Sequence, residues 1–177
     1  MIKKTITSLF CIYIFSGLSV SPAHALEIQT RYATIIYPSQ KLLEKMNYKI
    51  YLGKLRYYMP KNLTTIEAEF GAKIDVIIEQ VQSVLDMTPE NLRFRVTILP
   101  DVAAVRDSYV AIYGQSVSYV AFYSPSQNTV YMSPDKANLK VIAHELGHVV
   151  VENYFQIPPP VKVHEILAQF AERHLIN

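Results

Sequence analysis

Hydrophobic residues recur along most of the chain with the spacing of either a strand or a helix. Residues 31–37 and 94–99 are rich in β-branched and aromatic side chains, and each run stops at a proline. Short runs of this kind, bounded by turn residues, predict strands. Two further runs, residues 117–123 and 128–133, flank a Ser-Pro-Ser-Gln turn and predict a hairpin.

Five other segments carry the patterns of helices. The clearest is residues 65–86, where apolar side chains recur three and four residues apart behind a capping-box pair, Thr64 and Glu67. Ser39 and Asp101 are expected to cap two shorter helices. The expected ranges of the remaining helices are residues 39–48, 101–113, 137–154 and 161–175, and three consecutive prolines separate the last two.

The order of these elements predicts the fold class. A strand, two helices, a second strand, a helix, a hairpin and two final helices are typical of an α+β fold, with a small mixed sheet and the terminal helices packed against it. No internal repeat, low-complexity tract or linker interrupts the pattern. We therefore expect residues 26–177 to form a single domain.

The first 25 residues have the three-part pattern of a secretory signal peptide. Lys3 and Lys4 precede an apolar stretch, residues 6–20, and Ala23-His24-Ala25 supplies a small-residue cleavage site. The apolar stretch is shorter than the roughly 18–20 residues that a membrane span needs. We expect residues 1–25 to be a signal peptide that directs the chain to a bacterial periplasm or exterior and leaves no stable membrane anchor after cleavage.

Composition changes once this segment is set aside. The whole chain of 177 residues has a net charge of +2, but residues 26–177 carry 15 Lys and Arg against 15 Asp and Glu. Cys11, the only cysteine, also lies in the first segment, so disulfides and a cysteine nucleophile or ligand are excluded from the expected mature chain. No dense Lys/Arg cluster stands out, and no nucleic-acid partner is expected.

The histidines are concentrated near the end of the chain. Four of the five lie in the last 34 residues, and two belong to the motif His144-Glu145-Leu146-Gly147-His148. On a helix, two imidazoles four residues apart share a face and bind one tetrahedral Zn²⁺, while Glu145 lies beside the ion and holds a water. The flanking residues are apolar, so the motif is expected to be buried, where unpaired polar groups are costly. The motif therefore predicts a zinc site with His144 and His148 as ligands.

A catalytic zinc usually takes a third protein ligand and keeps one position open for water. Glu152 lies one turn beyond His148, but a straight helix spreads three successive turns over too great a length to surround one ion. The third ligand is therefore expected from the final helix. There, His164 and Glu165 are both candidates.

Residues 142–150 and 163–170 together resemble the gluzincin metallopeptidases, and they are most similar to the small peptidase-MA-like proteins. The first segment carries the His-Glu-x-x-His motif. In the second, Glu165, Ala168 and Phe170 match the Glu, Ala and aromatic positions of that family's Trp-x-x-Glu-Gly-x-Ala-x-[Tyr/Phe] segment. The resemblance implies that Glu165 is the third ligand. It also implies a zincin-like fold, in which the helix with the motif is followed by a C-terminal helix.

The same resemblance implies that an edge strand, residues 117–123 or 128–133, borders the cleft and pairs with an extended peptide. These features predict an exported zinc metallopeptidase that hydrolyses a peptide or protein substrate by a zinc-activated water, with Glu145 as general base. The alternative is a catalytically silent, zinc-bound domain of the same fold that binds extended peptides or a partner protein at its sheet edge.

The roles of several further side chains stay open at this point. The oxyanion-stabilising residue is left open among Tyr154, His164 and His174. Gln169 and Glu172 share a helix face with Glu165, and they either hydrogen-bond a ligand histidine or face solvent. A row of tyrosines either lines a substrate groove or belongs to the core and sheet surface; its members are Tyr109, Tyr113, Tyr119, Tyr123 and Tyr131.

Overall fold

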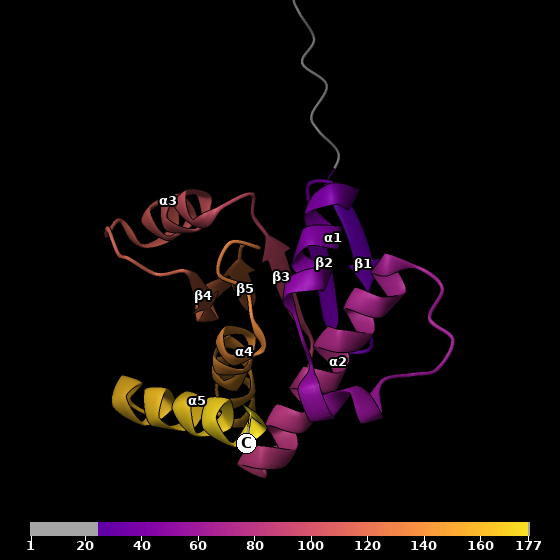
Figure 1. The fold of residues 1–177 in the computed structure, drawn as a ribbon. Helices are drawn as coiled ribbons and strands as arrows, with labels where there is room; N and C mark the ends of the chain where they lie inside the picture. Colours follow the sequence, from indigo (N-terminus) through magenta and orange to yellow (C-terminus); the bar gives the residue numbers. More distant parts are fainter. Residues whose placement is uncertain (1–24, 177) are drawn as a thin grey trace, which may run out of the picture.

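The computed structural model describes residues 25–176, so the expected signal peptide lies outside the described residues except for Ala25 (Figure 1). The strands are β1 (Leu26–Gln29), β2 (Ala33–Tyr37), β3 (Phe94–Ile98), β4 (Ala121–Ser124) and β5 (Thr129–Met132). The helices are α1 (Gln40–Lys49), α2 (Ile66–Leu85), α3 (Val102–Tyr113), α4 (Leu139–Tyr154) and α5 (Val161–Ile176), with short 3₁₀ turns η1 (Gly53–Tyr58) and η2 (Pro125–Gln127).

The five strands form one mixed sheet in the order β1-β2-β3-β5-β4. The three central strands, β2, β3 and β5, run parallel, whereas β1 and β4 are antiparallel to their neighbours at the two edges. Helix α4 packs against α2, α5 and strand β4, and α5 crosses α4 on the side away from the sheet (Figure 1). The α+β class and the small mixed sheet predicted from the sequence are confirmed.

Local capping explains why the helices begin where they do. Ser39 and Asp101 cap α1 and α3 as expected, and Gly114 ends α3 with a positive φ of 68°. The cap of α2 differs from the prediction, because Thr65 rather than Thr64 accepts the hydrogen bond from the backbone N–H of Ala68, at 3.1 Å. Adjacent threonines look alike in sequence, and only the extended backbone of Thr65 identifies the cap.

One predicted strand has the wrong boundary, and one strand and one 3₁₀ turn were not predicted. The expected strand 117–123 begins only at Ala121, because residues 115–119 are mostly exposed and pair with none of the described strands. Strand β1 and the turn η1 were not predicted at all. β1 pairs with β2 on one side only and is mostly exposed, so it shows no clear alternation of apolar and polar residues.

The helix that carries the His-Glu-x-x-His motif is buried on almost all sides, as its flanking residues predict. Its apolar side chains, Ile142, Ala143, Leu146, Val149, Val150 and Val151, are all fully inaccessible to solvent. Among residues 25–176, no helix combines the length and hydropathy needed to cross a membrane.

Candidate metal centre

The two histidines of the motif project from one face of α4. Asn138 starts this helix by accepting a hydrogen bond from the backbone N–H of Val141, at 3.0 Å, and the helix then continues unbroken through the motif. The Nε2 atoms of His144 and His148 lie 3.2 Å apart. The helical spacing therefore brings both imidazoles to a single point, as the motif predicts.

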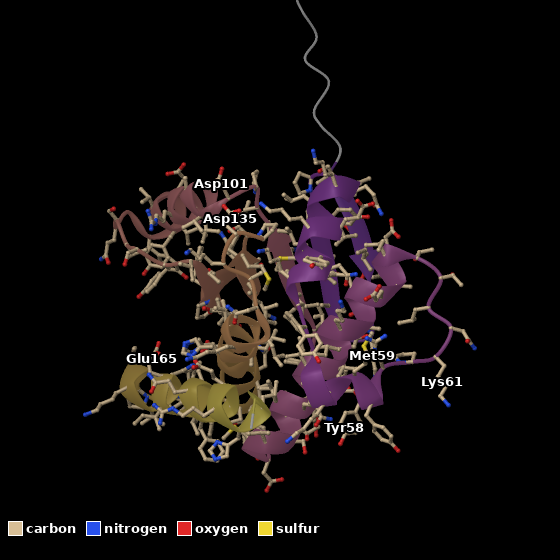
Figure 2. The ribbon with its side chains drawn as sticks, viewed as in Figure 1. Tyr58, Met59, Lys61, Asp101, Asp135 and Glu165 are labelled. Atoms are coloured by element: carbon tan, nitrogen blue, oxygen red, sulfur yellow. The ribbon has the colours of Figure 1, made fainter. Side chains whose placement is uncertain are left out.

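Close packing of α5 on α4 brings Glu165 to the same point. A Cβ atom on Gly147 would lie 2.8 Å from the Cα of Ala168, so only glycine allows the two helices to approach this closely. The Oε1 atom of Glu165 lies 3.4 Å from Nε2 of His148, and its Oε2 atom lies 3.7 Å from Nε2 of His144. In Figure 2, Glu165 projects from the first part of α5.

These three residues form a group that could hold a metal ion, since one donor atom from each lies within 4.8 Å of the others. Ligands at 2.0–2.1 Å from a tetrahedral zinc ion are separated from one another by about 3.3–3.4 Å. The separation of 3.2 Å between the two Nε2 atoms, and that of 3.4 Å between Nε2 of His148 and Oε1 of Glu165, are close to that value, and the 3.7 Å distance from His144 is to the other carboxylate oxygen. Two imidazoles and one carboxylate also match the donor set of catalytic zinc sites, so the residues fit the ion.

The carboxylate of Glu172 orients His144 through the ring nitrogen that does not face the other two donor atoms. Nδ1 of His144 lies 3.1 Å from Oε2 of Glu172 on α5, and Oε1 of Glu172 pairs with Nζ of Lys140 at 3.0 Å. Because the carboxylate accepts a hydrogen bond from Nδ1–H, the lone pair of His144 is left on Nε2, where the three donor atoms meet. Of the two interpretations of Glu172, the structure favours the contact with a ligand histidine, whereas Gln169 is exposed.

A second histidine orients His148 in the same way. Nδ1 of His148 lies 2.9 Å from Nδ1 of His164, and Nε2 of His164 lies 3.1 Å from Oε2 of Glu152. Glu152 accepts a hydrogen bond from Nε2–H of His164, and Nδ1 of His164 then accepts one from Nδ1–H of His148. His164, the other candidate for third ligand, thus contacts the ring nitrogen of His148 that faces away from Glu165.

Glu145 lies next to this group with a different environment. Its side chain is buried, and the backbone N–H of Tyr123 on β4 donates a hydrogen bond to its carboxylate. Burial raises the pKa of Glu145 from 4.5 to about 8, and the nearby Glu165 adds to the effect. Burial, with His144 and His164 close by, lowers the pKa of His148 from 6.5 to about 3. The histidine is therefore neutral, as a metal ligand must be.

The group opens into a cleft of about 500 Å³. One wall is aromatic, with Tyr109, Tyr113, Tyr119 and Phe122, and the opposite wall includes Pro158, Pro159 and Val161 before and at the start of α5. Four members of the tyrosine row line this cleft, since Tyr123 also reaches it. Tyr131 is not among the lining residues and instead stacks on Phe122.

Two expected helpers lie away from the cleft. Tyr154 is 46 % exposed and packs against Phe155, while His174 is exposed and stacks on Phe170. Sequence reasoning missed the role of Glu152 as the partner of His164. Its position four residues after His148 was a usable signal, because that spacing keeps the two residues on one face of α4.

No protein-family model, curated protein or solved structure matches the chain. Its function is therefore inferred from the chemistry of the cleft.

Proposed function

We propose that this chain is a zinc-dependent metallopeptidase of the gluzincin type, with a zincin-like fold. Its metal ligands are His144, His148 and Glu165, and its general base is Glu145. The observation that carries the proposal is the convergence of two imidazole nitrogens and one carboxylate at metal-binding distances, with a second, buried carboxylate beside them in the same cleft.

Bound zinc supplies Lewis acidity, which lowers the pKa of water towards 7 and polarises a peptide carbonyl. Glu145 has the buried position of a general base beside the three ligands, and it acts in its ionised form. It accepts the proton of the attacking water on its carboxylate, and it then donates that proton to the nitrogen of the departing amine. The hydrogen bond from the backbone N–H of Tyr123 holds the carboxylate of Glu145 in place during both transfers.

The sheet supports an extended peptide as substrate. β4 is the last strand of the sheet and has β5 as its only strand neighbour among the described residues. Three residues of β4, Ala121, Phe122 and Tyr123, line the cleft, so a peptide paired with its free edge would pass beside the metal ligands. The signal-peptide pattern of residues 1–25 supports a reaction outside the cytoplasm, in the periplasm or the exterior, as part of this proposal.

A catalytically silent domain that binds zinc and extended peptides is the second candidate. The observation that favours it concerns the oxyanion, the negatively charged oxygen that develops on the peptide carbonyl when water attacks it. Both ring nitrogens of His164 are engaged by His148 and Glu152, and the other two expected helpers, Tyr154 and His174, do not line the cleft. In the peptidase, a metal ion held by His144, His148 and Glu165 would therefore supply most of the oxyanion stabilisation.

The substitution Glu145→Gln separates the two candidates. Wild-type protein loaded with zinc should cleave members of a peptide library, and the variant should bind one equivalent of zinc but cleave at least 10²-fold more slowly, a loss on the order of that for a general base. Glu90→Gln, the same change at an exposed site, is the control and should keep full activity. Bound zinc without cleavage by wild type would favour the silent domain, and failure to bind zinc would refute both.

A further inference from the structure

A second surface of the molecule combines exposed tyrosines with basic residues. Four tyrosines between α1 and the loop after η1 are strongly exposed: Tyr48 (88 %), Tyr51 (78 %), Tyr57 (88 %) and Tyr58 (55 %). Lys49, Lys54, Arg56 and Lys61 are interspersed with them and are also exposed. We call these eight residues the Tyr-Lys surface. It is not part of the metal cleft, since none of its residues lines that cleft.

The charge of this segment contrasts with that of the rest of the domain. Residues 45–66 contain five Lys or Arg and no Asp or Glu. The remainder of residues 26–177 contains ten Lys or Arg and 15 Asp or Glu. Lys45 pairs with Asp135 at 2.9 Å, and the other four cations of the segment, Lys49, Lys54, Arg56 and Lys61, belong to the Tyr-Lys surface. Within a domain that is neutral in total, this segment therefore carries a net charge of +5 and the remainder a net charge of −5.

The backbone around η1 directs the side chains of the Tyr-Lys surface towards solvent. Leu52 and Leu55 are buried and anchor η1 to the core, so the residues between and after them face solvent. A groove of about 490 Å³ lies beside η1, and Leu52, Met59 and Leu63 contribute apolar walls. Its charged lining consists of Arg56, Lys61 and an ion pair between Lys73 and Glu69 at 3.0 Å, so the unbalanced charge of the groove is positive. Tyr58 and Lys61 project from the lower right of the molecule in Figure 2, far from Glu165 on the left.

We propose that the Tyr-Lys surface docks the domain reversibly on an anionic phospholipid membrane. Tyrosine prefers the boundary between water and hydrocarbon, because its ring is apolar and its hydroxyl is polar. Anionic headgroups attract lysine and arginine. The apolar walls of the groove would contact the hydrocarbon that lies just below the headgroups. The surface has the aromatic, aliphatic and cationic groups that this boundary requires. With the domain docked this way, the metal cleft stays away from the lipid and open to substrates.

The chain contains no tryptophan, so a single introduced tryptophan can report membrane contact at one chosen position. The full-length variant Tyr57→Trp contains one tryptophan, whose emission reports on the environment of position 57 alone. Vesicles of phosphatidylglycerol and phosphatidylcholine should shift that emission to shorter wavelength, and vesicles of phosphatidylcholine alone should not. Tyr154→Trp places the probe at another exposed tyrosine, which should not respond. Because the signal is local, it excludes contacts made elsewhere in the chain.

Removing positive charge tests the electrostatic part of the proposal. In the Tyr57→Trp background, Arg56→Gln with Lys61→Gln should weaken binding to the anionic vesicles on the order of 10- to 30-fold, since each cation contributes about fivefold. Lys136→Gln with Lys162→Gln removes the same charge elsewhere and should change the affinity little. The proposal is overturned if the emission of the Tyr57→Trp variant does not respond to anionic vesicles or responds equally to neutral ones. It is also overturned if a single-stranded oligonucleotide or an acidic peptide binds this surface more tightly than the lipid does.

Discussion

At the scale of single residues, burial shifts the pKa values of Glu145 and His148 in opposite directions, although the two residues are only three positions apart. Burial disfavours the charged form of each, so it raises the pKa of the carboxyl to about 8 and lowers that of the imidazole to about 3. The result is a centre that, without metal, keeps the carboxyl of Glu145 protonated at neutral pH, where an exposed glutamate is ionised, and keeps His148 neutral even in mild acid, where an exposed histidine is charged.

These opposite shifts predict the pH dependence of stability in metal-free protein. Between pH 4.5 and about 8, folded Glu145 keeps a proton that the unfolded chain releases, so this residue lowers stability as pH rises. Between pH 6.5 and about 3, folded His148 stays neutral while the unfolded chain binds a proton, so this residue lowers stability as pH falls. The two effects oppose each other between pH 4.5 and 6.5, where stability should be greatest.

Urea unfolding of chelator-treated protein at a series of pH values measures this curve. Each flank should have a slope of at most about 1.4 kcal/mol per pH unit from the group concerned. In Glu145→Gln, the decline above pH 6.5 should become shallower, while the acid flank should remain. An alkaline flank of unchanged slope in this variant would show that another group causes it.

His164 and Glu165 are adjacent but contact the centre differently, so their substitutions should have different effects. Glu165→Ala removes one of three donor atoms and should weaken zinc binding by several orders of magnitude. His164→Ala removes only the residue that orients His148, for which a loss on the order of 10- to 100-fold is expected. His174→Ala, an exposed histidine on the same helix, is the control. Zinc affinity is measured by competition with a chromogenic chelator, and a larger loss for His164→Ala would make His164 the ligand.

At the scale of elements, the centre depends on how closely two helices pack. α4 supplies His144 and His148, α5 supplies Glu165, and the contact at Gly147 determines the distance between the helices. A side chain at this position would meet the backbone of Ala168, which cannot move without displacing α5.

Gly147→Ala should therefore destabilise the protein by about 1–3 kcal/mol and weaken zinc binding, because α5 must move away from α4. Gly71→Ala is the matched control within helix α2. There, the added Cβ meets only side-chain methyl groups, at 3.0 and 3.5 Å, far from the ligands. Thermal unfolding and zinc titration of both variants measure the difference. Unchanged zinc affinity in Gly147→Ala would show that the helix contact does not position Glu165.

Local patterns were sufficient to predict most elements and part of the centre. Helical periodicity identified α2, α4 and α5, and the i, i+4 spacing placed both histidines on one face of a helix. The edge strand β1 was missed because it is paired on one side and mostly exposed. The contacts of His164 with Glu152 and of Glu172 with His144 join residues 12 and 28 positions apart. They depend on the angle at which α5 crosses α4, which no local pattern contains.

For the molecule as a whole, the proposed zinc site links metal binding to folding stability, since its three proposed ligands come from two helices that are brought together only in the folded state. Zinc at 100 times its dissociation constant should stabilise the folded domain by about 2.7 kcal/mol. For a domain of this size, the midpoint of thermal unfolding should rise by roughly 5–10 °C.

This shift should require the centre itself. Glu165→Ala should show little stabilisation by zinc at the same concentration, and wild type should respond little to Mg²⁺, which prefers six oxygen ligands. Differential scanning fluorimetry of chelator-treated protein measures each case. Equal stabilisation of wild type and Glu165→Ala would mean that zinc binds elsewhere in the chain.

Helix α5 contributes both the third ligand and Glu172, which orients His144. The loss of zinc should therefore loosen α5 before any other helix, and hydrogen exchange along residues 161–176 should increase first.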